Sequence, residues 1–346
     1  MTISKKPLEK VVIFASSFLD KPIYSIEEDE AFVLLRSLED CEVEYRCDRE
    51  HRTPLKASEL ENAVAVIADL EVYDENILKE IGIGGNGNVR LISRYGVGVD
   101  SIDLDAATKY GVMVTNCPGC NSLPVAEWTL STILDVAGKR IHNHELASAG
   151  KTKENSSRQD ISGKVMGVIG TGNAGKEIVK IMSGFGVKVI AYTPNPNLDW
   201  KRNNGVTYHD NPKDIYKSAD IITLHATLQD RRPLIGENEI KMMKPTLILI
   251  NCARDYLVDE VAVYNAVKEG RLFGYGIDDC WMRKDLPLQG LNIVTSPHVG
   301  SDSDLGKKGM RNMSTQAVAD LLSRKIPRYV VNKEVLSHEK WEGYVQ

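Results

Sequence analysis

The sequence predicts an α/β protein with two domains built on parallel β-sheets, and three observations support this fold class. The chain has 346 residues, which is enough for two domains of ordinary size. Short uncharged apolar segments alternate with segments of helical periodicity along most of the chain. One apolar segment leads directly into a glycine-rich turn that is followed by a helical pattern. Strands without polar alternation are typical of parallel sheets covered on both faces.

The first series of elements fills the N-terminal third of the chain. Helices are predicted over residues 26–38 and 102–110 because their apolar residues recur at helical spacing. A long helix is expected from about residue 125 to 149, and the polar residues 151–160 are expected to form a surface loop. Strands are predicted at residues 11–15, 64–68, 91–93 and 112–114.

The second series of elements follows this loop and contains no internal repeat. A helix is predicted over residues 260–269, and other helical segments lie between several of the strands. Strands are predicted at residues 165–169, 187–192, 221–224, 247–250, 276–278 and 293–295.

The composition is that of an ordinary globular protein and argues against several functions. Hydrophobic residues make up 42% and charged residues 26%, and the net charge of −5 argues against a nucleic-acid partner. No segment reaches the ~18 apolar residues of a membrane helix, so no membrane partner is expected. Cys117 and Cys120 form a C-x-x-C pair, but no second pair completes a metal site. We therefore expect no metal, two reduced thiols in a turn and a cytoplasmic location.

The glycine-rich turn at residues 170–175 has the pattern G-x-G-x-x-G of a phosphate-binding loop. Gly170 permits the tight turn, Gly172 lets the backbone approach a pyrophosphate, and Gly175 lets the next helix pack on the strand. Asn173 and Ala174 begin this helix, whose N-terminus would face the anion. The turn and its flanking elements therefore predict a bound dinucleotide.

A dinucleotide site normally has an acidic residue at the end of the next strand, where it binds the adenosine ribose. Thr193 stands directly after the predicted strand instead, and Asp199 lies farther along. No arginine follows the strand at once, although Lys201 and Arg202 come soon after. These residues favour NAD with NADP as the open alternative, and Thr193 is expected to lie near the cofactor.

Eight segments resemble motifs of the D-isomer-specific 2-hydroxyacid dehydrogenase family, and together they span nearly the whole chain. They are R-Y-G-V-G-V-D-S-I-D at 94–103, V-T-N-C-P-G at 114–119, V-A-E at 125–127, I-S-G-K at 161–164, M-K-P at 243–245, I-N-C-A-R at 250–254, S-P-H-V-G at 296–300 and V-N at 331–332. The resemblance implies a Rossmann-type dinucleotide-binding domain, residues 116–300, inserted into a flavodoxin-like substrate domain, residues 1–115 and 301–346. It also implies an active site in the cleft between the domains, and a homodimer.

The resemblance implies a role for each candidate substrate residue. Arg254 would bind the carboxylate and carbonyl of a small 2-keto acid, since a planar guanidinium suits this two-point contact. His298 would be the acid and base, because an ordinary histidine pKa near ~6.5 allows proton exchange near neutral pH. The backbone amides of Val97 and Gly98 would also contact the carboxylate, and a plain turn is the alternative for them.

Three further residues are implied to lie near the cofactor. Asp278 would accept a hydrogen bond from the nicotinamide carboxamide. Cys252 and His225 would lie beside the dinucleotide, His225 near the adenosine or the bridging phosphates. A purely structural histidine at a strand end is the alternative for His225.

One position departs from the family pattern. The family usually carries a glutamate five residues after the aspartate that Asp278 matches, and this glutamate raises the pKa of the catalytic histidine. Arg283 stands there, and a cation would lower the pKa of His298. Three explanations stay open: Asp279 or Asp285 reaches His298, the histidine works unpaired, or the protein is a dinucleotide-sensing binder with weak catalysis.

The loop after the predicted strand 64–68 bears on the substrate. Asp69 and Glu71 stand there, where members acting on phosphoglycerate are expected to have cationic groups. Two carboxylates would repel a phosphate, so we expect a non-phosphorylated substrate. The predicted function is an NAD(P)-dependent oxidoreductase acting on a small 2-keto or 2-hydroxy acid, with D-specificity implied by the resemblance.

Overall fold

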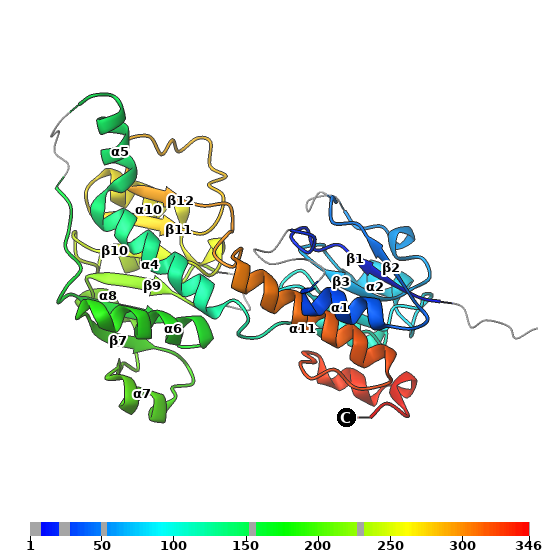
Figure 1. Ribbon diagram of the computed structural model, residues 1–346. Coiled ribbons are helices and arrows are strands. Elements are labelled where there is room, and N and C mark those ends of the chain that lie inside the picture. The colour runs from blue at the N-terminus through cyan, green and yellow to red at the C-terminus, as the bar shows by residue number, and fades with distance from the viewer. Residues whose placement is uncertain (1–7, 21–27, 50–53, 152–156, 227–231, 346) are drawn as a thin grey trace, which may run out of the picture. The chain divides into compact units, whose positions relative to one another are not determined.

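The computed structural model describes residues 8–20, 28–49, 54–151, 157–226 and 232–345 (Figure 1). The chain divides into two compact units. Unit 1 comprises Met1–Asn121 and Asp304–Gln346, and unit 2 comprises Ser122–Ser303. Residues 26–27 of the first predicted helix and 152–156 of the predicted surface loop lie outside the described ranges.

Unit 1 contains a five-stranded parallel sheet in the order β2-β1-β3-β4-β5. Its strands are β1 (Glu9–Ile13), β2 (Cys41–Tyr45), β3 (Ala63–Ala68), β4 (Leu91–Arg94) and β5 (Met113–Thr115). Strand β3 reads A-V-A-V-I-A and is almost fully buried, as a central strand covered on both faces must be. This strand order is that of flavodoxin-like sheets, which confirms the predicted fold of this part of the chain.

Aspartates begin three helices of unit 1, because Asp29, Asp74 and Asp103 each accept a hydrogen bond from a backbone N–H of the first turn. The C-terminal helix α11 lies beside α1 (Figure 1). Arg311 of α11 is 1% exposed and forms a buried ion pair with Asp29 at 3.2 Å, which ties the end of the chain to its beginning. The helices are α1 (Glu30–Ser37), α2 (Glu75–Ile81), α3 (Leu104–Lys109) and α11 (Asp304–Leu322).

Unit 2 contains a seven-stranded parallel sheet in the order β12-β11-β10-β9-β6-β7-β8. The strand order reverses between β6 and β9, as it does in a Rossmann-type dinucleotide-binding sheet, so the predicted fold of this unit is confirmed. Ligands of such sheets bind beyond the carboxyl ends of the strands at this reversal. The strands are β6 (Val165–Ile169), β7 (Lys188–Tyr192), β8 (Thr207–Tyr208), β9 (Ile221–Leu224), β10 (Ile248–Asn251), β11 (Gly274–Ile277) and β12 (Ile293–Thr295).

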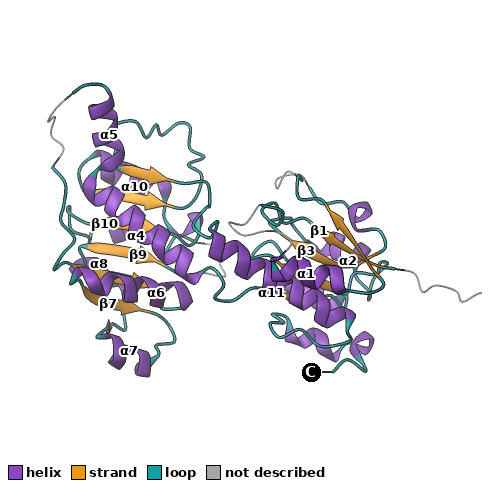
Figure 2. Cartoon of the chain, viewed as in Figure 1, coloured by secondary structure: helices purple, strands orange, loops and turns teal. Residues whose placement is uncertain are grey.

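Helices flank the strands of unit 2, as Figure 2 shows. Helix α4 packs against α6 and against β10, β11 and β12, so it covers the β10–β12 end of one face. None of the described helices is both long and apolar enough to cross a membrane. The helices are α4 (Ser122–Gly138), α5 (Arg140–Ser148), α6 (Asn173–Met182), α7 (Leu198–Asn204), α8 (Pro212–Ser218), α9 (Glu237–Ile240) and α10 (Glu260–Lys268).

The predicted long helix 125–149 is wrong in one respect, because the chain breaks it into α4 and α5. Lys139 has a left-handed backbone with φ of 46°, which an α-helix cannot contain. Gly138 precedes this break, and glycine is a poor residue for a helix interior. Helix α5 contacts α4, and none of its residues is fully buried by the described part of the chain.

Candidate active site

The glycine-rich turn joins β6 to α6 and leaves open the space that a phosphate group needs. Gly170 has φ of 94°, and a Cβ there would lie 2.6 Å from the carbonyl oxygen of His225. A Cβ on Gly175 would lie 2.1 Å from the carbonyl oxygen of Gly170, so the helix packs too closely for a side chain. By contrast, a Cβ on Gly172 would meet nothing within 4 Å. Each glycine thus has the surroundings expected from its place in the motif.

The first turn of α6 is available to bind an anion. Gly172 is its N-cap, and a glycine has no side chain that could cap the backbone N–H groups of the first turn. Asn173 is exposed and Ala174 is half-buried at this end of the helix. The free N–H groups and the helix dipole both favour a phosphate here. These residues therefore fit the pyrophosphate of a dinucleotide.

The end of β7 offers no carboxylate to a ribose. Thr193 follows β7 and is half-buried. Asp199 lies in α7, where it pairs with Arg202. Lys176 of α6 lies 5.8 Å above the ring of Trp200, so a cation stands on this side of the unit.

His225 and Cys252 follow adjacent strands and contact each other. The Nδ1 atom of His225 lies 3.2 Å from the Cys252 sulfur, and its Nε2 atom lies 3.0 Å from the hydroxyl of Thr223. Burial lowers the pKa of His225 to about 4 and raises the pKa of Cys252 to about 12. Both side chains are therefore neutral near neutral pH, and His225 has the satisfied partners of a structural histidine.

Arg254 follows β10 in a segment that is fixed by a buried side chain. Asn251 is 1% exposed; its amide nitrogen donates to the carbonyl oxygen of Arg254 at 2.7 Å. Its amide oxygen accepts from the N–H of Ala253 at 3.1 Å. The Asn251 side chain thus holds the backbone that presents the guanidinium, a role that the sequence motif did not reveal.

Asp278 follows β11 and holds the segment that carries His298. Its carboxylate accepts hydrogen bonds from the hydroxyl of Ser296 at 2.6 Å and from the N–H groups of Val299 at 2.8 Å and Gly300 at 2.6 Å. His298 lies between these contacts and has an unusual positive φ of 58°. The three hydrogen bonds that the Asp278 carboxylate accepts offset the strain of that conformation.

Asp279 is the acidic partner of His298. Its Oδ2 atom lies 3.9 Å from Nδ1 of His298, which is an ion-pair distance and longer than a direct hydrogen bond. The Asp279 carboxylate raises the pKa of His298 above its ordinary value, burial opposes this effect, and the charge of Asp278 adds to it. Burial would raise the pKa of Asp279, but His298 and the N–H of Cys280 hold it below its ordinary value.

The expectation that Arg283 lowers the pKa of His298 is therefore wrong. Arg283 forms two hydrogen bonds with Asp285, at 2.9 and 2.6 Å, and its charge is compensated there. Arg254 is the cation that does act on His298, opposing its protonation, and it also lowers the pKa of Asp279. Arg254, Asp279 and His298 thus lie close enough to influence one another at the carboxyl edge of one sheet.

The predicted substrate residues of unit 1 follow β4. The Val97 side chain is 38% exposed and Gly98 is half-buried. The side-chain amide of Asn116 donates to the carbonyl oxygen of Val97 at 2.7 Å. This contact connects the predicted substrate loop to the residue after β5.

Asp69 and Glu71, the carboxylates after β3, are not two free negative charges that would repel a phosphate, as the sequence led us to expect. Glu71 is 1% exposed, and burial raises its pKa above the ordinary value. Asp69 accepts hydrogen bonds from the N–H and the hydroxyl of Ser16, both at 3.0 Å, and lies 3.9 Å from Arg94. The charge of Asp69 is balanced by Arg94, and Glu71 is turned inward.

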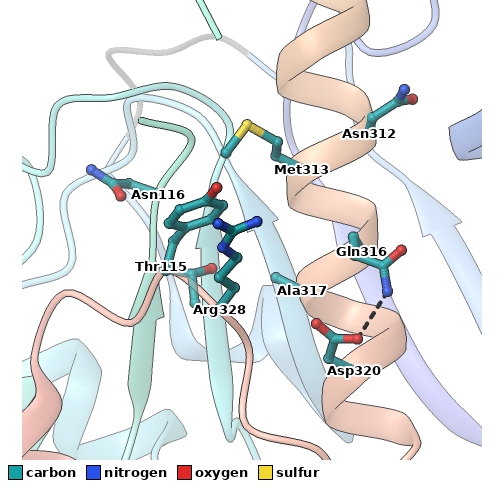
Figure 3. A pocket seen from close by; sticks show the side chains of 9 residues that line it. Thr115, Asn116, Asn312, Met313, Gln316, Ala317, Asp320 and Arg328 are labelled. Atoms are coloured by element: carbon teal, nitrogen blue, oxygen red, sulfur yellow. Dashed lines mark hydrogen bonds between the residues drawn. The ribbon is translucent and has the colours of Figure 1, made fainter. Parts of the chain in front are cut away.

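Unit 1 also has a cavity of about 350 Å³ between the end of β5, helix α11 and the segment that follows it (Figure 3). Met313 and Ala317 contribute its apolar wall, and Arg328 contributes a guanidinium that lies over the ring of Tyr329 at 5.2 Å. Asn116 is the lining residue that also contacts the predicted substrate loop. In the described part of the chain, no group of three or more histidine, cysteine or acidic side chains could hold a metal ion.

Comparison with known proteins places this site in a family. The D-isomer specific 2-hydroxyacid dehydrogenase NAD binding domain matches residues 130–300. A glyoxylate reductase of Thermococcus litoralis is 30% identical over 302 residues, which cover 84% of this chain and 90% of that protein. A D-3-phosphoglycerate dehydrogenase of Methanocaldococcus jannaschii is 34% identical over 261 residues, which cover 73% of this chain and only 49% of that longer protein.

A solved structure shows the same fold. The apo-structure of D-lactate dehydrogenase from Escherichia coli has a TM-score of 0.77 at 21% identity, over 94% of this chain and 100% of that one. The matched domain binds NAD, and the open first turn of α6 fits its pyrophosphate. NAD is therefore the cofactor. The chain belongs to the D-isomer-specific 2-hydroxyacid dehydrogenase family.

Proposed function

We propose that the chain is an oxidoreductase that transfers hydride between NAD(H) and a small, non-phosphorylated 2-keto or 2-hydroxy acid of D configuration. One observation carries this proposal: Arg254 and His298 both follow strands at the carboxyl edge of the sheet that bears the glycine-rich turn, and the charge of Arg254 acts on His298. An acid paired with a carboxylate, next to a guanidinium, is the chemistry that reduction of a keto acid needs.

In the proposed reaction, bound NADH supplies the hydride. The Arg254 guanidinium binds the substrate carboxylate and carbonyl oxygen, so it orients the keto acid and stabilises charge on that oxygen. His298 in its protonated form donates a proton to the same oxygen. Asp279 favours that protonated form, and Asp278 keeps the backbone of His298 in place.

We assign the substrate domain to residues 1–115 and 301–346 and the dinucleotide-binding domain to residues 116–300. Val97 and Gly98 would offer backbone N–H groups to the substrate carboxylate, and the contact from Asn116 to Val97 helps to position this loop. Within the other domain, Thr193, Cys252 and His225 would line the dinucleotide as neutral groups.

A small substrate without a phosphate is supported by one of these relatives and by the end of β3. The Thermococcus litoralis relative is named for reduction of glyoxylate, a two-carbon keto acid. In unit 1, Arg94 lies beside Asp69, so the positive charge of Arg94 is already compensated and would attract a substrate phosphate less. Turnover of glyoxylate and hydroxypyruvate with no measurable turnover of 3-phosphohydroxypyruvate is the expected result, and the reverse preference would refute this substrate class.

NADP is a second cofactor besides NAD in this proposal, because Thr193 and not a carboxylate directly follows β7, so this position would not repel a 2′-phosphate. Titration with NADH and NADPH decides between them. We also propose a cytoplasmic homodimer. In the described part of the chain no α5 residue is fully buried, and Ile141 on it is 49% exposed, so a second copy would cover this exposed helix.

The competing function is a dinucleotide-sensing binder with weak catalysis. Its support was the cation at position 283, and the pairing of Arg283 with Asp285 removes that support. A panel of keto acids with NADH tests the two functions. Turnover of at least one acid supports the dehydrogenase, whereas tight NADH binding without any turnover supports the binder.

A further inference from the structure

The C-x-x-C segment of unit 1 forms a turn that brings two thiols together. Pro118 occupies the second position, and Gly119 has φ of 83° at the third, which is the pattern of a type II turn. The N–H of Cys120 donates to the carbonyl oxygen of Cys117 at 3.4 Å and closes the turn. The Cα atoms that end such a turn lie within ~7 Å, and a disulfide requires about 4.4–6.8 Å.

The two thiols differ in accessibility. Cys117 is 1% exposed, and its sulfur lies 3.3 Å from the carbonyl oxygen of Arg94. Cys120 is half-buried, and the absence of a side chain at Gly309 makes room for it, since a Cβ there would lie 2.9 Å from the Cys120 Cβ. The Cys120 thiol lowers the pKa of Cys117, whereas Cys117 and burial raise the pKa of Cys120, so the first thiolate of the pair forms at Cys117.

We propose that Cys117 and Cys120 form a thiol–disulfide exchange site that reacts with low-molecular-weight disulfides. The Cys117 thiolate takes the proton of the half-buried Cys120 thiol, and the Cys120 sulfur attacks one sulfur of the small disulfide, forms a mixed disulfide and releases one thiolate. The released thiolate takes the proton from Cys117, and the Cys117 thiolate then attacks the Cys120 sulfur and releases the second thiolate, which takes a proton from water. The two cysteines lose two protons and two electrons, and the small disulfide becomes two thiols.

The turn also contacts the loop assigned to substrate binding, and this part of the inference rests on the proposed function. The N–H of Cys117 donates to the carbonyl oxygen of Gly96 at 2.8 Å. The neighbouring Asn116 donates to Val97. A disulfide removes the Cys117 thiol from Arg94 and changes the turn next to these contacts. The oxidised enzyme is therefore expected to have a KM for the keto acid that is about tenfold higher, with unchanged NADH affinity.

The test uses the native full-length chain and oxidised glutathione as the probe. After incubation, free thiols are alkylated under denaturing conditions, and peptides are identified by mass spectrometry. We expect the peptide with Cys117 and Cys120 to lose two hydrogens and to escape alkylation. The exposed Cys280 should carry glutathione in the same sample, which shows that the oxidant was effective.

The variant Cys120→Ser is the matched control, because it keeps the turn and removes one thiol. In this variant Cys117 should stay reduced and alkylatable, and the KM should rise less with oxidised glutathione than that of the wild type, because modification of Cys280 is common to both proteins. Alkylation of both cysteines in a wild-type sample whose Cys280 is modified would overturn the inference. So would glutathione retained on Cys120 without ring closure. The mass readout needs no turnover, so failure of the proposed function and failure of the disulfide are distinguishable.

Discussion

The Oδ2 atom of Asp279 lies 3.9 Å from Nδ1 of His298, whereas Arg283 stands at the position where the family pattern predicts a glutamate. Asp279 directly follows Asp278, whose own carboxylate binds the backbone on both sides of His298. Two consecutive acids after β11 thus act on the histidine in different ways. Asp278 binds the backbone beside His298, and Asp279 raises the pKa of His298.

Replacement Asp279→Asn should lower the pH at which kcat/KM for keto acid reduction begins to decline. The reduction requires protonated His298, so kcat/KM is highest below the histidine pKa and falls as the pH rises through it. Asp279 raises the pKa of His298, and its loss moves this fall toward lower pH. At pH 8 we expect kcat/KM to be about tenfold lower or more.

The matched control is Asp285→Asn, which removes a carboxylate that pairs with Arg283 and not with His298. Its pH profile of kcat/KM should overlay that of the wild type. Equal shifts in both variants would mean that Asp279 has no special relation to His298.

Arg254→Lys should lose most of the activity although the charge is kept. A lysine cannot form the planar two-point contact with carboxylate and carbonyl. We expect kcat/KM for glyoxylate to fall about 100-fold or more, with the NADH dissociation constant unchanged in a fluorescence titration. A loss of only twofold would exclude Arg254 from the substrate site.

Gly172→Val should fold normally and bind NADH poorly. No atom lies within 4 Å of a Cβ at Gly172, so the side chain points into the space that the pyrophosphate needs. We expect an NADH dissociation constant raised about tenfold or more, with an unchanged melting temperature. Gly184→Val is the control, since Gly184 also has open space, and it should leave NADH binding intact.

Asp278→Asn should affect both stability and kcat. An amide nitrogen cannot accept from the N–H groups of Val299 and Gly300, so one of them loses its partner at a cost of about 1–3 kcal/mol in the free energy of unfolding. Ser296→Ala removes only one of the three contacts and should cost less in both urea denaturation and kcat. An Asp278→Asn enzyme with wild-type stability and kcat would show that the contacts do not hold His298.

Much of the fold could be predicted from the sequence because buried parallel strands lack polar residues. Strand β3, with six small apolar residues, and the turn after β6 were both evident. Strand β2 was not predicted, since an edge strand reading C-E-V-E-Y alternates with charged residues that its exposed face tolerates. The break at Lys139 was missed because a left-handed residue has no reliable sequence signal when it is not glycine.

The candidate site was predicted less completely. Motifs pointed to Arg254 and His298, but the partner of His298 was one of several nearby carboxylates. Only the packing of the residues after β11 distinguishes Asp279 from Asp285, which pairs with Arg283. Glu71 was misjudged for a similar reason, because its burial is a property of the fold and not of its neighbours in sequence.

The most direct test of the account compares NADH oxidation by the wild type and by His298→Gln with glyoxylate as substrate. Wild-type oxidation should depend on the keto acid. The variant should lose about 100-fold or more in kcat while its NADH dissociation constant stays the same. Equal kcat values in the two proteins, or a wild type that binds NADH and reduces no keto acid, would contradict it.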